Sequence, residues 1–159
     1  MIIALLFALL SVSPALAFDG AKLQLSADQS LANGTNQVIS WATADYDTLS
    51  FFNPAQPTRL TVPNGVSWVR LTGSQVYATS CGGTMRQLII TKNGTWFSGD
   101  PVINTPPTCS GTTTDISGFS PVTPVVPGDY FEVSAFQNTG SALNLRWSTG
   151  TWFSIEVVP

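Results

Sequence analysis

The chain has 159 residues, of which only 9% are charged, with a formal net charge of −3 and no histidine. So few positive charges exclude a basic nucleic-acid-binding face, and the lack of histidine removes imidazole bases and most zinc sites. The length allows one domain, and an apolar fraction of 43% is enough for one hydrophobic core.

Residues 1–17 differ from the rest of the chain. They are apolar from Ile2 to Leu10 and end in Ala15-Leu16-Ala17, the pattern of small residues that signal peptidase accepts. The apolar run is shorter than the roughly 20 residues that span a bilayer. We therefore expect residues 1–17 to be a cleaved signal peptide and residues 18–159 to be the domain; an uncleaved anchor is the alternative.

After Ala17 the apolar residues alternate with polar ones in short runs between turn residues, which is typical of β-strands. The predicted strands are 22–25, 38–42, 59–62, 66–78, 85–91, 95–98, 116–126, 130–136, 143–147 and 152–158. Asn93-Gly94 predicts a two-residue hairpin turn, because both central residues of a type I′ turn need a positive φ. This pattern predicts an all-β antiparallel sandwich, with the Pro/Thr-rich residues 100–115 as a long surface loop.

Two predicted strands are apolar on both faces. Val66 and Trp68 lie opposite Val69 and Leu71, while Trp152 and Val158 lie opposite Phe153, Ile155 and Val157. An antiparallel strand with two apolar faces needs a second burial partner, so Val66, Trp68, Trp152 and Val158 are candidates for a subunit interface. The alternative is scattered apolar surface residues, which are common.

The two cysteines, Cys81 and Cys109, lie in predicted loops. An even pair in an exported protein indicates a disulfide, which would here join two loops. A catalytic thiol is the alternative, but no histidine is present to activate it.

Several fragments in order resemble the C1q/TNF-like jelly-roll family, and most of all its variant from bacterial and phage genomes. They are Trp41 with 45–47, 59–63, 69–73, 92–94, 127–133, 137–140, 143–145 and 151–158. The resemblance covers about residues 20–158 and implies a ten-stranded jelly roll that assembles as a trimer and binds without catalysis. Unlike the animal members, the sequence has no collagen-like Gly-X-Y stalk.

Two further features suggest binding sites. Asp45 and Asp47 are two residues apart on one strand face and could hold Ca²⁺, the only cofactor we consider; two solvated carboxylates before a turn are the simpler interpretation. Trp96 follows the Asn93-Gly94 turn, where an exposed indole could stack on a sugar; packing is the alternative.

The sequence thus predicts a non-enzymatic homotrimeric head for binding or adhesion, secreted or on a particle surface. A phage virion protein, either a capsid decoration trimer or a tail-fibre tip, is the first alternative, and a lectin-like glycan-binding module is the second. The expected partners are other copies of the chain and a glycan, protein or capsid surface. No nucleic acid is expected, and no membrane once the leader is removed.

Overall fold

The computed structural model describes residues 18–96, 102–147 and 150–159, and all of the regular elements in these residues are β-strands. The strands are β1 (Gly20–Gln24), β2 (Gln29–Leu31), β3 (Gln37–Val38), β4 (Thr43–Asp47), β5 (Arg59–Thr61), β6 (Trp68–Tyr77), β7 (Arg86–Lys92), β8 (Val102–Thr105), β9 (Thr114–Phe119), β10 (Thr123–Pro124), β11 (Tyr130–Gln137), β12 (Leu143–Leu145) and β13 (Trp152–Val157). The predicted all-β class is therefore confirmed. The described residues hold thirteen strands instead of ten: β2, β4 and β8 were not among the ten, the predicted strand 116–126 forms both β9 and β10, and no strand begins at Thr95.

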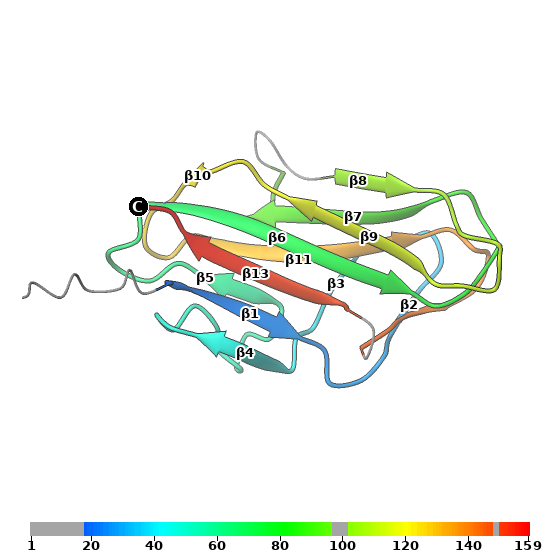
Figure 1. Cartoon of the computed structure of the whole chain (residues 1–159), viewed down its shortest axis with the longest axis horizontal. Helices are drawn as coiled ribbons and strands as arrows, with labels where there is room; N and C mark the ends of the chain where they lie inside the picture. The colour runs from blue at the N-terminus through cyan, green and yellow to red at the C-terminus, as the bar shows by residue number, and fades with distance from the viewer. Residues whose placement is uncertain (1–17, 97–101, 148–149) are drawn as a thin grey trace, which may run out of the picture.

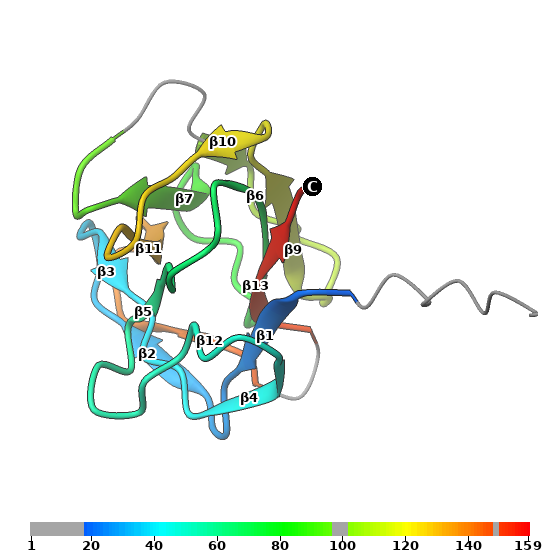
Figure 2. The ribbon, with the colours of Figure 1, turned by 90° about the vertical axis from the view of Figure 1, so that its left-hand side faces the viewer.

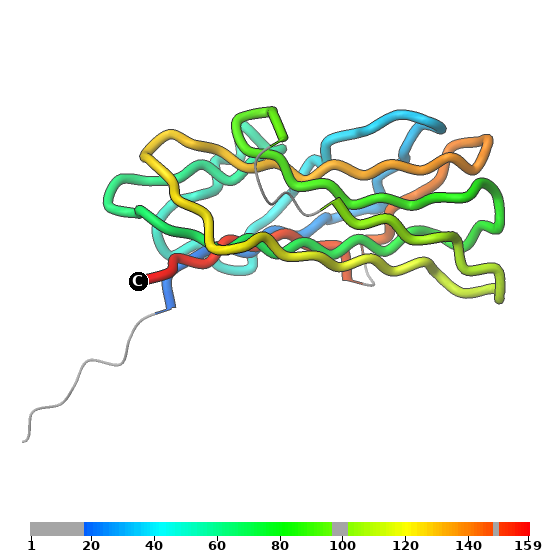
Figure 3. The backbone as a smooth tube through the Cα atoms, turned by 90° about the horizontal axis from the view of Figure 1, so that it is seen from above, coloured from blue at the N-terminus to red at the C-terminus, as the bar shows by residue number. Residues whose placement is uncertain are grey.

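The strands form two antiparallel sheets that lie face to face (Figures 1 and 2). The larger sheet has the order β2-β12-β6-β13-β1-β4, with β9 and β10 paired along the other edge of β6. The smaller sheet has the order β3-β11-β7-β8, with β5 also paired to β11. Seen from above, the two layers run along the long axis of the molecule (Figure 3).

The core lies between the sheets and follows the alternation of the sequence. Val69 and Leu71 on β6 and Phe153 and Ile155 on β13 share the faces that the alternation predicts, and all four are buried. The sheets approach so closely that a Cβ added at Gly73 would lie 3.3 Å from a methyl carbon of Leu88 on the opposite sheet. Any side chain at position 73 would therefore press on the core.

One buried polar network also joins the sheets. The Tyr77 hydroxyl lies 2.8 Å from Gln75 Oε1 and 2.7 Å from the Gln87 carbonyl oxygen and donates its one hydrogen to one of these acceptors, while Gln75 Nε2 donates to the Ser134 carbonyl at 2.9 Å. Gln75 and Tyr77 lie on β6, whereas Gln87 and Ser134 belong to the smaller sheet. Because buried polar groups need partners, this network fixes how the two sheets sit on each other.

The hairpin turn at Asn93-Gly94 is confirmed. Both residues have positive φ, 53° and 72°, and Lys92 and Thr95 exchange two backbone hydrogen bonds of 3.0 Å around them. Thr95 forms an isolated bridge but no strand, and residues 97–98 of the predicted strand 95–98 lie outside the described residues. The predicted leader, residues 1–17, also lies outside them.

Two other local predictions are wrong. Residues 100–115 are not one long loop, because Val102–Thr105 forms β8 on the edge of β7 and Thr114 begins β9. The predicted strand 116–126 is divided at Ser120–Val122 into β9 and β10. The segment Thr43–Asp47, on which Asp45 and Asp47 were expected to share a strand, is an edge strand that pairs with β1.

Candidate interaction face on the larger sheet

The outer face of the larger sheet, which points away from the core, carries the candidate site. On β6 the outward residues are Trp68, Arg70 and Thr72, since Val69 and Leu71 between them point inward. Strand β13 presents Glu156 beside Arg70, and β9 presents Phe119 beside Thr72. We call the surface made by Trp68, Arg70, Thr72, Phe119, Val122, Glu156 and Val158 the outer face.

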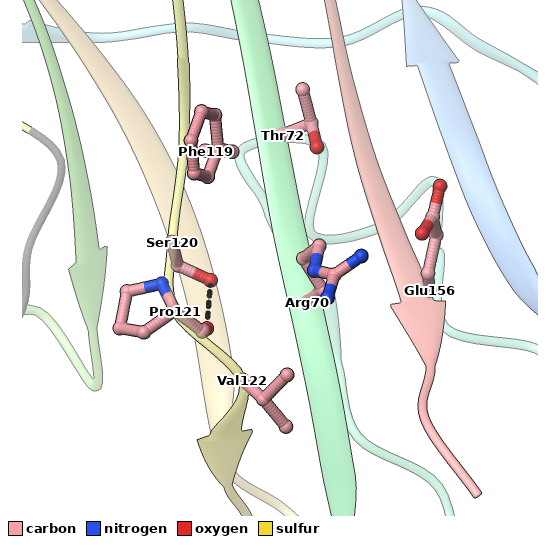
Figure 4. Close-up of a pocket in the computed structure, with 7 residues that line it drawn as sticks. All are labelled: Arg70, Thr72, Phe119, Ser120, Pro121, Val122 and Glu156. Carbon is pink, nitrogen blue, oxygen red and sulfur yellow. Dashed lines mark hydrogen bonds between the residues drawn. The ribbon is translucent and has the colours of Figure 1, made fainter.

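A hollow of about 460 Å³ lies on this face (Figure 4). Its floor is β6 with Arg70 and Thr72, one wall is the segment from Phe119 to Val122, and Glu156 stands on the other side. The wall bends because Ser120 leaves the strand pattern. Its hydroxyl accepts from the Leu71 amide at 3.0 Å and donates to the Pro121 carbonyl at 2.7 Å.

The rim of the hollow is apolar. Phe119 is 72% exposed and Val122 is also exposed, while Trp68 is 46% exposed further along β6. Single exposed apolar residues are ordinary, but Phe119 and Val122 line the same hollow, so two exposed apolar side chains gather at one place on the surface. Such patches are typical of interaction surfaces.

The floor of the hollow carries two opposite charges. Arg70 and Glu156 are direct partners in the register of β6 and β13. Within the described ranges, neither side chain makes an ion pair within 4.0 Å. A guanidinium and a carboxylate on one open face are therefore both available to a partner.

The predicted interface residues divide into two groups. Trp68 is exposed, and Trp152 and Val158 are half-buried on the outward side of the larger sheet. Val66 is 4% exposed and belongs to the core, so including it was wrong. Strand β6 begins only at Trp68, and the alternation that would place Val66 outward does not extend to that residue.

Trp152 also packs within its own chain. The Lys22 ammonium lies 5.6 Å from the centre of the Trp152 ring, and the same ammonium pairs with Asp45 at 2.9 Å. These contacts hold the indole on the surface of β13 beside β1. Part of the ring is thus already covered before any partner arrives.

Phe119, Arg70 and Glu156 are the site residues that the sequence analysis missed. Phe119 lies within a predicted strand, but the position of the break at Ser120 decides which way the ring points. Buried and exposed residues alternate along β9, with Thr114, Ile116 and Gly118 buried. A predicted strand that ended at Phe119 would therefore have placed this ring outward. The positions of Arg70 and Glu156 side by side depend on the strand register, which the sequence does not state.

The two cysteines lie close together at one end of the sandwich. Both are exposed thiols here, and the Cys109 thiol lies 4.0 Å from the Cys81 carbonyl oxygen. A hydrogen bond between the two side chains raises the pKa of the Cys81 thiol, and burial adds a smaller rise. The predicted disulfide remains a prediction, made between two loops that are in contact.

The Arg86 side chain supports the Cys81 loop from inside. It is fully buried, and its guanidinium donates to the carbonyl oxygens of Ser80 and Gly82, on either side of Cys81, at 3.2 and 3.1 Å. Burial lowers the pKa of Arg86, because a buried charge is poorly solvated. Carbonyl oxygens thus partner the two terminal nitrogens of Arg86, whereas its Nε has no acceptor in the described residues.

Asp45 and Asp47 have separate contacts in the structure. Asp45 accepts from Gln24 and pairs with Lys22, whereas the two oxygens of Asp47 accept from the amides of Phe51 and Phe52 at 2.9 Å. Among the described residues no group of three or more His, Cys, Asp or Glu side chains gathers as a metal site requires. Trp96 is exposed after the hairpin turn and does not line this hollow.

In the part of the chain that the structure describes, no helix is long and apolar enough to cross a membrane.

No family model matches the sequence, and no curated protein matches it. Among solved structures, murine APRIL at pH 5.0 is similar with a TM-score of 0.64 at 14% identity, over 89% of this chain and 100% of that chain. Eiger TNF from S. frugiperda has a TM-score of 0.58 at 11% identity, over 89% and 93% of the two chains. The globular domain of zebrafish complement 1qA protein has a TM-score of 0.56 at 12% identity, over 90% of this chain and 98% of that chain. The chain therefore has the all-β jelly-roll fold shared by TNF-like and C1q-like domains.

Proposed function

We propose that this protein is a non-enzymatic binding head that assembles as a homotrimer through the outer face of its larger sheet. The observation that carries the proposal is the pairing of Phe119, 72% exposed, with an adjacent hollow on a TNF-like and C1q-like jelly roll. The sequence resemblance to the bacterial and phage-type variant supports the same assembly.

The outer face suits a second copy of the same chain. Each copy carries both a projecting aromatic ring and a hollow, and both a guanidinium on Arg70 and a carboxylate on Glu156 that have no ion-pair partner among the described residues. A contact in which one copy's ring enters the next copy's hollow is head-to-tail, and such contacts close into rings when the rotation allows. Three copies would then cover Trp68 and Val158 as well.

The chemistry of the chain favours binding over catalysis. There is no histidine to act as a base. Asp129, Glu132 and Asp28 are paired with Lys92, Arg59 and Arg146, and Asp47 holds backbone amides. These carboxylates stabilise turns and strand edges.

We place the head outside the cell or on a particle surface. The predicted leader in residues 1–17 supports export, and the resemblance to phage-encoded heads supports a virion component, either a decoration trimer or a fibre tip. Sequencing the N-terminus of the protein isolated from its natural source separates these: a chain beginning after Ala17 favours secretion, and an intact leader on purified particles favours the virion.

The assembly is tested by light scattering of residues 18–159 over a range of concentrations. We expect a mass three times that of the monomer. A monodisperse monomer at all concentrations would overturn the proposal.

A further inference from the structure

The chain contains three Asn-Gly pairs, at residues 33–34, 64–65 and 93–94, and each pair lies in a turn. In an Asn-Gly pair the backbone nitrogen of the glycine reaches the asparagine side chain with little hindrance, because glycine has no Cβ. The sequence alone therefore makes the three pairs equally reactive. Their surroundings in the structure differ.

The pair Asn33-Gly34 is held by two hydrogen bonds. The Gly34 amide donates to the Gln137 carbonyl at 2.8 Å, and Asn33 Oδ1 accepts from the Gly140 amide at 2.7 Å. An attack by the Gly34 nitrogen on the Asn33 side chain requires the nitrogen to give up its hydrogen bond and the side chain to turn toward it. Both groups are thus restrained by partners far away in the sequence.

The pair Asn93-Gly94 is held through its side chain. Asn93 Nδ2 donates to Asp129 Oδ1 at 2.8 Å, and Asn93 Oδ1 accepts from the Tyr130 amide at 2.9 Å. The space beside Gly94 is also limited, since a Cβ added there would lie 3.1 Å from the Tyr130 hydroxyl. The side-chain amide of Asn93 therefore cannot turn toward the Gly94 nitrogen without losing two hydrogen bonds.

The pair Asn64-Gly65 has no such restraint. Both residues are exposed in the turn between β5 and β6, and neither makes a hydrogen bond or an ion pair with any of the described residues. Gly65 has a φ of +86°, and no atom lies within 4 Å of a Cβ added there. The Asn64 side chain can therefore rotate freely, and the surroundings leave room for a ring that joins the two residues.

From this contrast we infer that Asn64 is the site at which the folded chain deamidates, without an enzyme and with water as the only co-reactant. The Gly65 nitrogen attacks Cγ of Asn64 and forms a C–N bond, while Nδ2 leaves as ammonia and takes the proton of the Gly65 amide with it. The product is a succinimide, which water then opens. Opening at Cγ gives aspartate at position 64, and opening at the main-chain carbonyl gives isoaspartate.

The modification changes the turn that leads into the outer face. Either product adds a negative charge, and isoaspartate also lengthens the main chain by one carbon atom. The turn lies between Val62 and Val66, which are both buried, and β6 begins at Trp68 on the outer face. Isoaspartate at position 64 therefore alters the backbone just before the strand that carries this face.

The test is incubation of the full folded protein at mildly alkaline pH, which favours loss of the Gly65 amide proton, followed by peptide mapping with mass spectrometry. We expect conversion at Asn64 to be at least about tenfold faster than at Asn33 or Asn93, because two hydrogen bonds restrain each of the other pairs. Conversion at Asn33 or Asn93 that is as fast as at Asn64, or an unchanged Asn64, would overturn the inference.

Two controls separate the fold from the local sequence. In the chain unfolded with guanidinium chloride the three pairs should convert at similar rates, and an equal excess at Asn64 in this state would overturn the structural explanation. Asn64→Gln should remove the early acidic form on ion-exchange chromatography, because attack on the longer side chain needs a less favourable six-membered ring. An acidic form that appears as quickly in Asn64→Gln would overturn the assignment to this turn.

Discussion

Removing the Phe119 ring should weaken assembly far more than folding. Full burial of a phenylalanine side chain stabilises by about 1.5–3 kcal/mol. Since Phe119 is 72% exposed in the single chain, about 1–2 kcal/mol remains to be gained from a partner. Three such contacts give about 3–6 kcal/mol per trimer, so Phe119→Ala should raise the dissociation constant by about 10²–10⁴-fold.

The assay is sedimentation equilibrium over several concentrations, with urea unfolding of each variant as the folding measurement. Trp96→Ala is the matched control, because that ring is 62% exposed and lies after the Asn93-Gly94 hairpin. We expect Phe119→Ala to dissociate at concentrations where the wild type and Trp96→Ala remain trimeric. Equal sedimentation of the two variants would refute the reasoning, as would a wild-type chain that is monomeric throughout.

Three further predictions concern stability. Gly83→Ala should lower the free energy of unfolding in urea by at least about 2 kcal/mol, because φ at this position is +73° and the added Cβ would lie 2.1 Å from a backbone carbonyl oxygen. Gly128→Ala is the control: φ is +90° but no atom lies within 4 Å of the added Cβ, so backbone strain alone should lower the free energy of unfolding by about 1–2 kcal/mol. Burial raises the pKa of Asp129, but hydrogen bonds from Lys92, Asn93 and the Val126 amide outweigh it and hold this pKa below its usual value. The stabilisation is therefore complete above the unfolded pKa of about 3.9 and is lost as the pH falls through the lowered value, and Asp129→Asn should flatten this part of a pH series of urea midpoints. Under oxidising conditions the chain should gain about 3–4 kcal/mol over Cys81→Ser, and an equal midpoint for the two oxidised proteins would count against the disulfide.

The sequence predicts best where local chemistry and packing agree. Leu71, Phe153 and Ile155 alternate with polar residues and are buried, and Asn93-Gly94 forms the expected turn. It predicts less well where pairing alone decides, as in β4, whose residues are almost all exposed. Propensity cannot identify such an edge strand, because its conformation comes from hydrogen bonds to β1.

The candidate sites depend on a finer level of detail. The sequence predicts that Trp68 points outward because buried and exposed residues alternate regularly from Trp68 along β6. It does not predict the same for Phe119, which lies just before the break at Ser120. Residues 25–30 and 40–42, which are separate in the sequence, line one depression of the surface. Strand register and loop packing bring these residues together, and the sequence of a single strand predicts neither of them.

The ends of the described chain lie at one pole of the sandwich, where the Val157 amide donates to the Asp19 carbonyl at 2.9 Å (Figure 1). The loops that carry Cys81 and Cys109 lie at the opposite pole. A tether attached at either end would consequently leave the cysteine loops on the side of the molecule that faces away from the support. A fusion protein or immobilised sensor could use either end without changing which pole is displayed.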